Sequence, residues 1–155
     1  MNNPIISMLD TVGKQSGYLY LLVVVGVFRL FERVRYLVAF LVICMINVNL
    51  VKCAKIMIRE PRPQMMITDK TNPEYYGMPS GHAFHASFIT TFLWMVRPSL
   101  TVLYGCIIVV CITLVERYIH KRHSINQLLA GLVSGSVFAY ICVWVLRYYF
   151  EKNLL

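Results

Sequence analysis

Charged residues are scarce in this chain of 155 residues: they make up 14% of it, while 58% is hydrophobic. An ordinary soluble domain carries more charge on its surface, so a single water-soluble core is the less favoured alternative. The expected solvent around most of the chain is lipid, and the predicted fold class is all-α, a polytopic membrane helical bundle. The sequence also lacks internal repeats and low-complexity segments. At this length we therefore expect one domain over residues 1–155.

Three other signals are absent. The five cysteines have neither CxxC nor Cys/His zinc spacing, so we expect buried apolar side chains, and they indicate no redox compartment. The N-terminus lacks a basic region followed by an A-x-A site, which argues against a cleaved signal peptide. The net charge is +8, but no basic patch interleaves with aromatic residues outside the apolar segments, so no nucleic-acid partner is expected. Loop lysines and arginines are instead expected to set topology and contact lipid headgroups.

The apolar runs predict about five membrane-spanning helices. They lie at residues 17–31, 36–58, 83–96, 100–115 and 125–150. Residues 1–16 are polar and mixed, and they form either an interfacial amphipathic helix or a frayed terminus. Insertion of this segment would raise the number of spans to six. The protein is expected in the endoplasmic reticulum membrane if eukaryotic, or in the cytoplasmic membrane if bacterial.

Two polar connections separate these spans. Residues 59–81 form a long loop that is rich in proline, and residues 116–124 form a charged break. The second span ends where the long loop begins, and the third span begins where it ends. The charged break likewise joins the fourth and fifth spans. Counting spans therefore places both connections on the same membrane face, where we expect a common mouth.

The end of the long loop reads Pro-Ser-Gly-His, from Pro79 to His82. Pro79 would end any regular secondary structure before it, and Ser80 is a good N-cap for a helix that begins at Gly81 or His82. The first turn of such a helix presents bare backbone N–H groups, which suit a phosphate oxygen. His82 would then be a proton donor beside the bound anion.

Three motifs lie at the expected mouth. In the first, six residues separate Lys55 from Arg62-Pro63. The second is Pro-Ser-Gly-His. In the third, five residues separate Arg117 from His123, and three residues separate His123 from Gln127. Together they resemble the signature of the type 2 phosphatidic acid phosphatase superfamily, K-x6-R-P, P-S-G-H and S-R-x5-H-x3-D, over residues 52–132. Glu-Pro-Arg-Pro, Tyr-Gly-Met and the final glutamine are most similar to the dolichyl diphosphatase branch.

The resemblance implies a role for each matching residue. His123 would be the nucleophile that forms a phosphohistidine, and His82 would protonate the leaving oxygen and then activate water. The amide of Gln127 would accept a hydrogen bond from the second imidazole nitrogen. The residues expected to bind substrate phosphate are Lys55, Arg62, Ser80, Gly81 and Arg117. No metal or other cofactor is required.

Two residues depart from the family pattern. Gln127 stands in place of the usual aspartate and stabilises a developing imidazolium less, which suits a diphosphate because a lipid phosphate leaves more easily than an alkoxide. Glu116 stands in place of the usual serine. An anion there would repel substrate unless it is paired, with Arg59 or Lys121 as the candidate partners.

The resulting hypothesis is an integral-membrane lipid diphosphatase acting on a polyprenyl, dolichyl-type diphosphate, with the bilayer and its lipid substrate as partners. One alternative is a broader lipid phosphate monoesterase that acts on phosphatidate, and another is a non-catalytic binder of lipid headgroups. A metal site built from the pairs His82/His85 and His120/His123 is disfavoured, because Lys55, Arg62 and Arg117 would repel a cation.

Overall fold

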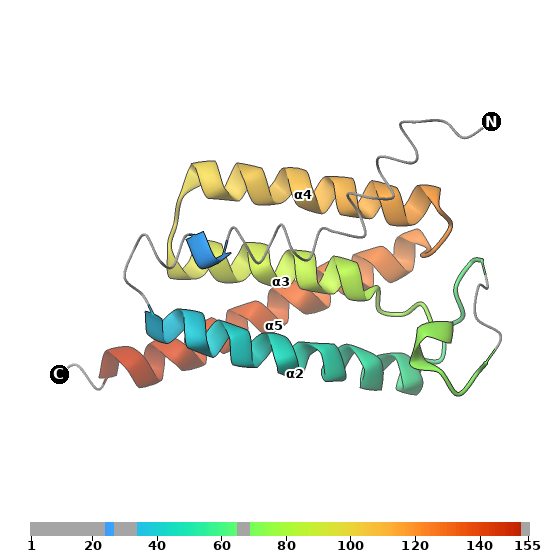
Figure 1. The fold of residues 1–155 in the computed structure, drawn as a ribbon, viewed down its shortest axis with the longest axis horizontal. Helices are drawn as coiled ribbons and strands as arrows, with labels where there is room; N and C mark the ends of the chain where they lie inside the picture. The colour runs from blue at the N-terminus through green and yellow to red at the C-terminus, as the bar shows by residue number, and fades with distance from the viewer. Residues whose placement is uncertain (1–23, 27–33, 65–68, 153–155) are drawn as a thin grey trace.

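The computed structural model describes residues 24–26, 34–64 and 69–152. Within these residues the helices are α2 (Val34–Ile58), α3 (Gly81–Val96), α4 (Leu100–Ile119) and α5 (Ile125–Lys152), with a short 3-10 turn, η1 (Pro73–Tyr75). The same residues contain no strand, only an isolated bridge between Pro61 and Tyr76. The prediction of an all-α helical bundle is therefore confirmed (Figure 1).

Three of the described helices are long and apolar enough to cross a membrane. Each contains an 18-residue stretch of high mean hydropathy, 2.2 in α2, 2.0 in α4 and 2.1 in α5. Helix α3 has 16 residues and is therefore about 24 Å long, shorter than the roughly 30 Å hydrocarbon core of a bilayer. The predicted segments at residues 1–16 and 17–31 lie outside the described residues, apart from the three at 24–26. Many large apolar side chains of α2, α4 and α5 face outward, as expected of an integral membrane protein.

Helix α3 is the centre of the bundle. It buries residues on most of its circumference, and it packs most closely against α5. Two glycines of α5 permit this approach, because a Cβ at Gly131 would lie 2.6 Å from the carbonyl oxygen of Ser80, and one at Gly135 would lie 2.2 Å from that of Phe84. On the other side, Phe40 of α2 packs against an aromatic ring of α3, Phe92, with ring centroids 5.1 Å apart.

The predicted common mouth is confirmed. Figure 1 shows the C-terminal ends of α2 and α4 and the N-terminal ends of α3 and α5 at the same end of the bundle. Backbone hydrogen bonds tie these ends together: Gly77 N–H donates to the Glu60 carbonyl at 2.7 Å, and Ser80 N–H donates to the Gln127 carbonyl at 3.0 Å. The loop that follows α2 is thereby held against the start of α5.

The helix boundaries at the mouth agree with the sequence at α3 and differ at α4. Helix α3 begins at Gly81, and the hydroxyl of Ser80 accepts a hydrogen bond from the backbone N–H of Ala83. The prediction that the fourth span ends at residue 115 is wrong, because α4 continues to Ile119. Glu116 and Arg117 are buried and form an ion pair, so their charges do not end the helix.

Candidate active site

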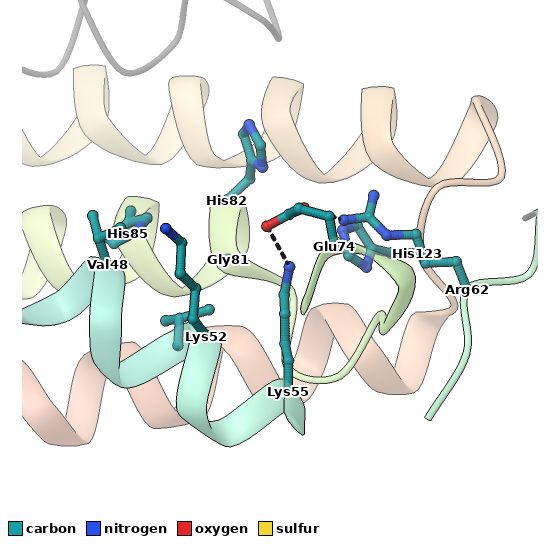
Figure 2. A pocket seen from close by; sticks show the side chains of 10 residues that line it. Val48, Lys52, Lys55, Arg62, Glu74, Gly81, His82, His85 and His123 are labelled. Carbon is teal, nitrogen blue, oxygen red and sulfur yellow. Dashed lines mark hydrogen bonds and ion pairs between the residues drawn. The ribbon is translucent and has the colours of Figure 1, made fainter. Parts of the chain in front are cut away.

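A cavity of about 140 Å³ opens at the mouth between α2, the start of α3 and the loops on either side (Figure 2). Five of the predicted site residues line it: Lys55, Arg62, Gly81, His82 and His123. They come from four different segments of the chain. The cavity is smaller than the sites that enclose drug-sized ligands, and its size suits a headgroup better than a lipid tail.

Both predicted cations in the cavity contact one carboxylate. Lys55 lies in the last turn of α2 and is almost completely buried, and Arg62 lies in the loop that follows. Glu74 of η1 reaches between them, with its Oε1 3.2 Å from Lys55 Nζ and its Oε2 2.6 Å from Arg62 Nη2. Partial burial works to raise the pKa of Glu74, but the charges of Lys55 and Arg62 outweigh it and hold this pKa below its usual value. The two cations thus already bind an oxyanion.

His123 lies in the connection between α4 and α5 and is 2% exposed. Burial, and then the positive charges of Arg62, Lys55 and Arg117, lower its pKa to about 4, although the hydrogen bond with Gln127 opposes this shift. The imidazole is therefore neutral near pH 7 and has a free lone pair, as a nucleophile requires. His82, in the first turn of α3, also lines this cavity.

Gln127 is buried in the first turn of α5, and it contacts both His123 and the loop after α2. Its Oε1 lies 3.2 Å from His123 Nδ1 and 3.3 Å from the backbone N of Ser124. Its Nε2 donates to Glu60 Oε1 at 2.7 Å and to the carbonyl of Pro61 at 2.9 Å. The expected contact between the glutamine and the histidine is therefore present, together with two partners that the sequence did not indicate.

Ser80 and Arg117 do not line the cavity. Ser80 is completely buried, and its hydroxyl caps α3. Arg117 is 4% exposed, and its Nε lies 2.7 Å from Glu116 Oε2. The expectation that Glu116 pairs with Arg59 or Lys121 is wrong, because the ion pair is made with the adjacent residue of the same helix. Glu116 is neutralised inside the bundle and does not line the cavity as a repulsive anion.

Further cavity residues were missed by the sequence reasoning. Lys52 and His85 are not among the predicted site residues, but both line the cavity. Their spacing from predicted site residues could have identified them, because residues three positions apart lie on the same face of a helix. Lys52 has this relation to Lys55, and His85 has it to His82. Glu74 carried no comparable signal.

The four histidines do not meet at one place. His82, His85 and His123 line the same cavity, whereas His120 lines another one with Pro63 and Lys121. In the part of the chain that the structure describes, no three histidine, cysteine, aspartate or glutamate side chains are grouped to hold a metal ion.

The arrangement combines a neutral imidazole, a second imidazole and two cations that bind an oxyanion. These are the types of group that phosphoryl transfer requires. Comparison with curated proteins and with solved structures found no match. The family model described as PAP2 superfamily matches residues 33–151, which contain α2, α3, α4, all but the last residue of α5 and all of the candidate site. The chain therefore belongs to the PAP2 superfamily, whose members are phosphatases.

Proposed function

We propose that the protein is an integral-membrane lipid diphosphatase that hydrolyses a polyprenyl, dolichyl-type diphosphate to the monophosphate and inorganic phosphate. The observation that supports this most is the carboxylate of Glu74, held between Lys55 and Arg62 in a cavity that both His82 and His123 line. A terminal phosphate in the place of this carboxylate would have its charge balanced by the same two cations. It would also lie beside a neutral imidazole.

The reaction has two steps. In the first, Nε2 of His123 attacks the terminal phosphorus; an N–P bond forms, the P–O bond to the lipid monophosphate breaks, and His82 protonates the departing oxygen. In the second, His82 takes a proton from water, the water oxygen bonds to the phosphorus as the N–P bond to His123 breaks, and inorganic phosphate leaves. Protonation of His82 for the first step would accompany substrate binding, since the phosphate charge offsets the nearby cations.

The shape of the cavity favours a diphosphate over a monophosphate. Lys52 and His85 line it beside Lys55 and His82, one helical turn farther along α2 and α3 (Figure 2). Three residues of α-helix correspond to about 4.5 Å, and this displacement runs along α2 away from the mouth, toward the middle of the bundle. The inner phosphate of a diphosphate, which carries the lipid tail, would lie there. A monophosphate would leave this second pair of basic side chains without a partner.

The test is a comparison of substrates with purified protein in detergent micelles. Phosphate release is measured from a polyprenyl diphosphate, the corresponding monophosphate and phosphatidate, each with and without EDTA. His123→Ala is expected to abolish release and the acid-labile phosphorylated enzyme. His120→Ala is the matched control, because it removes a histidine from the same connection but outside the cavity, and it should retain activity.

Each outcome separates the alternatives. Faster release from phosphatidate than from the diphosphate would favour the monoesterase and contradict the proposed substrate. Unchanged activity of His123→Ala would contradict the mechanism. Binding of the diphosphate lipid without any phosphate release would favour a non-catalytic headgroup binder, and inhibition by EDTA would contradict a metal-independent reaction.

A further inference from the structure

The two ends of the Gln127 amide face partners of opposite hydrogen-bonding character. Its Nε2 lies near two acceptors, Glu60 Oε1 at 2.7 Å and the Pro61 carbonyl at 2.9 Å. Its Oε1 faces the backbone N–H of Ser124 at 3.3 Å. A rotated amide would place its oxygen against both acceptors, so its orientation is determined by these three partners. The Nδ1 of His123 must then donate its hydrogen to Oε1, which leaves Nε2 without a hydrogen.

The loop after α2 closely surrounds this amide. A Cβ at Gly77 would lie 2.2 Å from Oε1 of Gln127 and 2.6 Å from its Nε2, so no other residue fits there without displacement of the glutamine. The backbone N–H of Gly77 also donates to the carbonyl of Glu60 at 2.7 Å. Glu60 and Gly77, from opposite ends of the loop, therefore hold the glutamine from two sides.

Asp or Glu at position 127 would bring a second carboxylate against Glu60, where the two negative charges would repel each other. The chain has a neutral amide at this position and a carboxylate immediately behind it. We infer that Glu60 is a positioning residue of the reaction: it orients and polarises the Gln127 amide, and through this amide it stabilises the positive charge that develops on His123.

The inference rests on the proposed function, in which His123 is the nucleophile. As the N–P bond forms, the imidazole ring becomes positively charged while the hydrogen on Nδ1 stays in place and bonds to Gln127. No proton passes to Glu60; its negative charge makes the amide oxygen a stronger acceptor. Two hydrogen bonds, of 2.7 and 3.2 Å, and the amide between them separate the carboxylate from the ring. For a separation on the order of 8 Å and an effective dielectric constant of about 20, the charge corresponds to an effect on the rate of about ten- to thirtyfold.

The experiment compares four enzymes: wild type, Glu60→Gln, Gln127→Glu and the double variant. Glu60→Gln retains an oxygen that can accept from Gln127 Nε2 and removes only the charge. We expect it to lower kcat about ten- to thirtyfold with little change in KM, because Glu60 does not touch the substrate. Asp69→Asn is the matched control in the same loop, where the Asp69 side chain accepts hydrogen bonds from the backbone N–H and the hydroxyl of Thr71. Its kcat should equal that of the wild type.

The double variant tests the pairing directly. Gln127→Glu is expected to have a lower kcat than Glu60→Gln, because two carboxylates then face each other. The double variant should have a kcat at least tenfold higher than that of Gln127→Glu alone. Rates are normalised to monodisperse protein, and melting temperatures are recorded for all four. If Glu60→Gln is poorly folded, the inference is judged by the kcat of the double variant relative to that of Gln127→Glu.

Two results would overturn the inference while leaving the proposed function intact. One is a wild-type kcat for Glu60→Gln together with an inactive His123→Ala. The other is a double variant no more active than Gln127→Glu alone. An active His123→Ala would instead remove the proposed function itself, and the inference with it.

Discussion

Replacement of Glu74 by glutamine should strengthen the binding of substrate phosphate. In the structure this carboxylate lies where the phosphate is expected, 3.2 Å from Lys55 Nζ and 2.6 Å from Arg62 Nη2, with its side chain 48% exposed. Ion pairs exposed to this extent contribute only about 0.2–1 kcal/mol each. Breaking both to admit a phosphate would therefore cost about 1 kcal/mol, which corresponds to a factor of about five in affinity.

The assay for Glu74→Gln measures KM for the lipid diphosphate and inhibition by inorganic phosphate. We expect both KM and the inhibition constant to fall about fivefold, since the amide no longer competes for the cations. Asp69→Asn is again the control, because it removes a carboxylate from the same loop without a contact to either cation. A higher KM for Glu74→Gln would refute the reasoning: it would mean that Glu74 orients Lys55 and Arg62 for the substrate more than it competes with it.

Three further predictions concern the pH dependence, the loop and the substrate. The pKa of His123 is lowered to about 4 in the folded protein, against an ordinary value of 6.5. Its neutral form is thus favoured by folding, so the associated stability is present above pH 6.5 and is lost as the pH falls toward 4. In the same way, the acid limb of kcat/KM attributable to this residue should lie near pH 4 and should move upward in Arg62→Gln, as measured in a pH–rate profile. Gly77→Ala should displace the Gln127 side chain and lower kcat at least tenfold, whereas Gly105→Ala, where a Cβ meets nothing within 4 Å, should not. Lys52→Gln should raise KM several-fold for a diphosphate but not for the corresponding monophosphate; equal effects on both substrates would contradict the proposed inner-phosphate site.

The sequence predicted the parts of the fold that local chemistry controls. The start of α3 follows from the proline, the capping serine and the glycine of the Pro-Ser-Gly-His motif, and the structure has the helix beginning at Gly81. The end of α4 was misplaced because charged residues were interpreted as a break. Charge ends a membrane helix only when it must reach water, and Glu116 and Arg117 instead neutralise each other while buried.

The same distinction applies to the candidate site. Lys55, Arg62, His82 and His123 belong to recognisable motifs, and counting spans was sufficient to bring them to one mouth. The contacts of the loop after α2 could not be predicted, because they join residues far apart in the sequence and follow no periodicity. The hydrogen bond between Glu60 and Gln127, for example, spans 67 positions. Only the folded loop shows that Glu60 lies behind Gln127 while Glu74 lies in the cavity that His123 lines.

These two glutamates give the site a charge balance that the motifs alone would not suggest. A pocket of cations without nearby carboxylates would hold inorganic phosphate as firmly as substrate, and product release would then limit turnover. Glu74, within reach of both Lys55 and Arg62, would replace the departing phosphate and return the cavity to the state seen in the structure. Glu60 bonds to Gln127, which lies behind the proposed nucleophile His123. In the proposed mechanism this glutamine by itself would activate the histidine less than a carboxylate would. Weak activation is sufficient when the leaving group is a lipid phosphate, and it would be insufficient for an alkoxide. The electrostatics around His123 therefore support the proposed cleavage of a phosphoric anhydride over that of a simple ester.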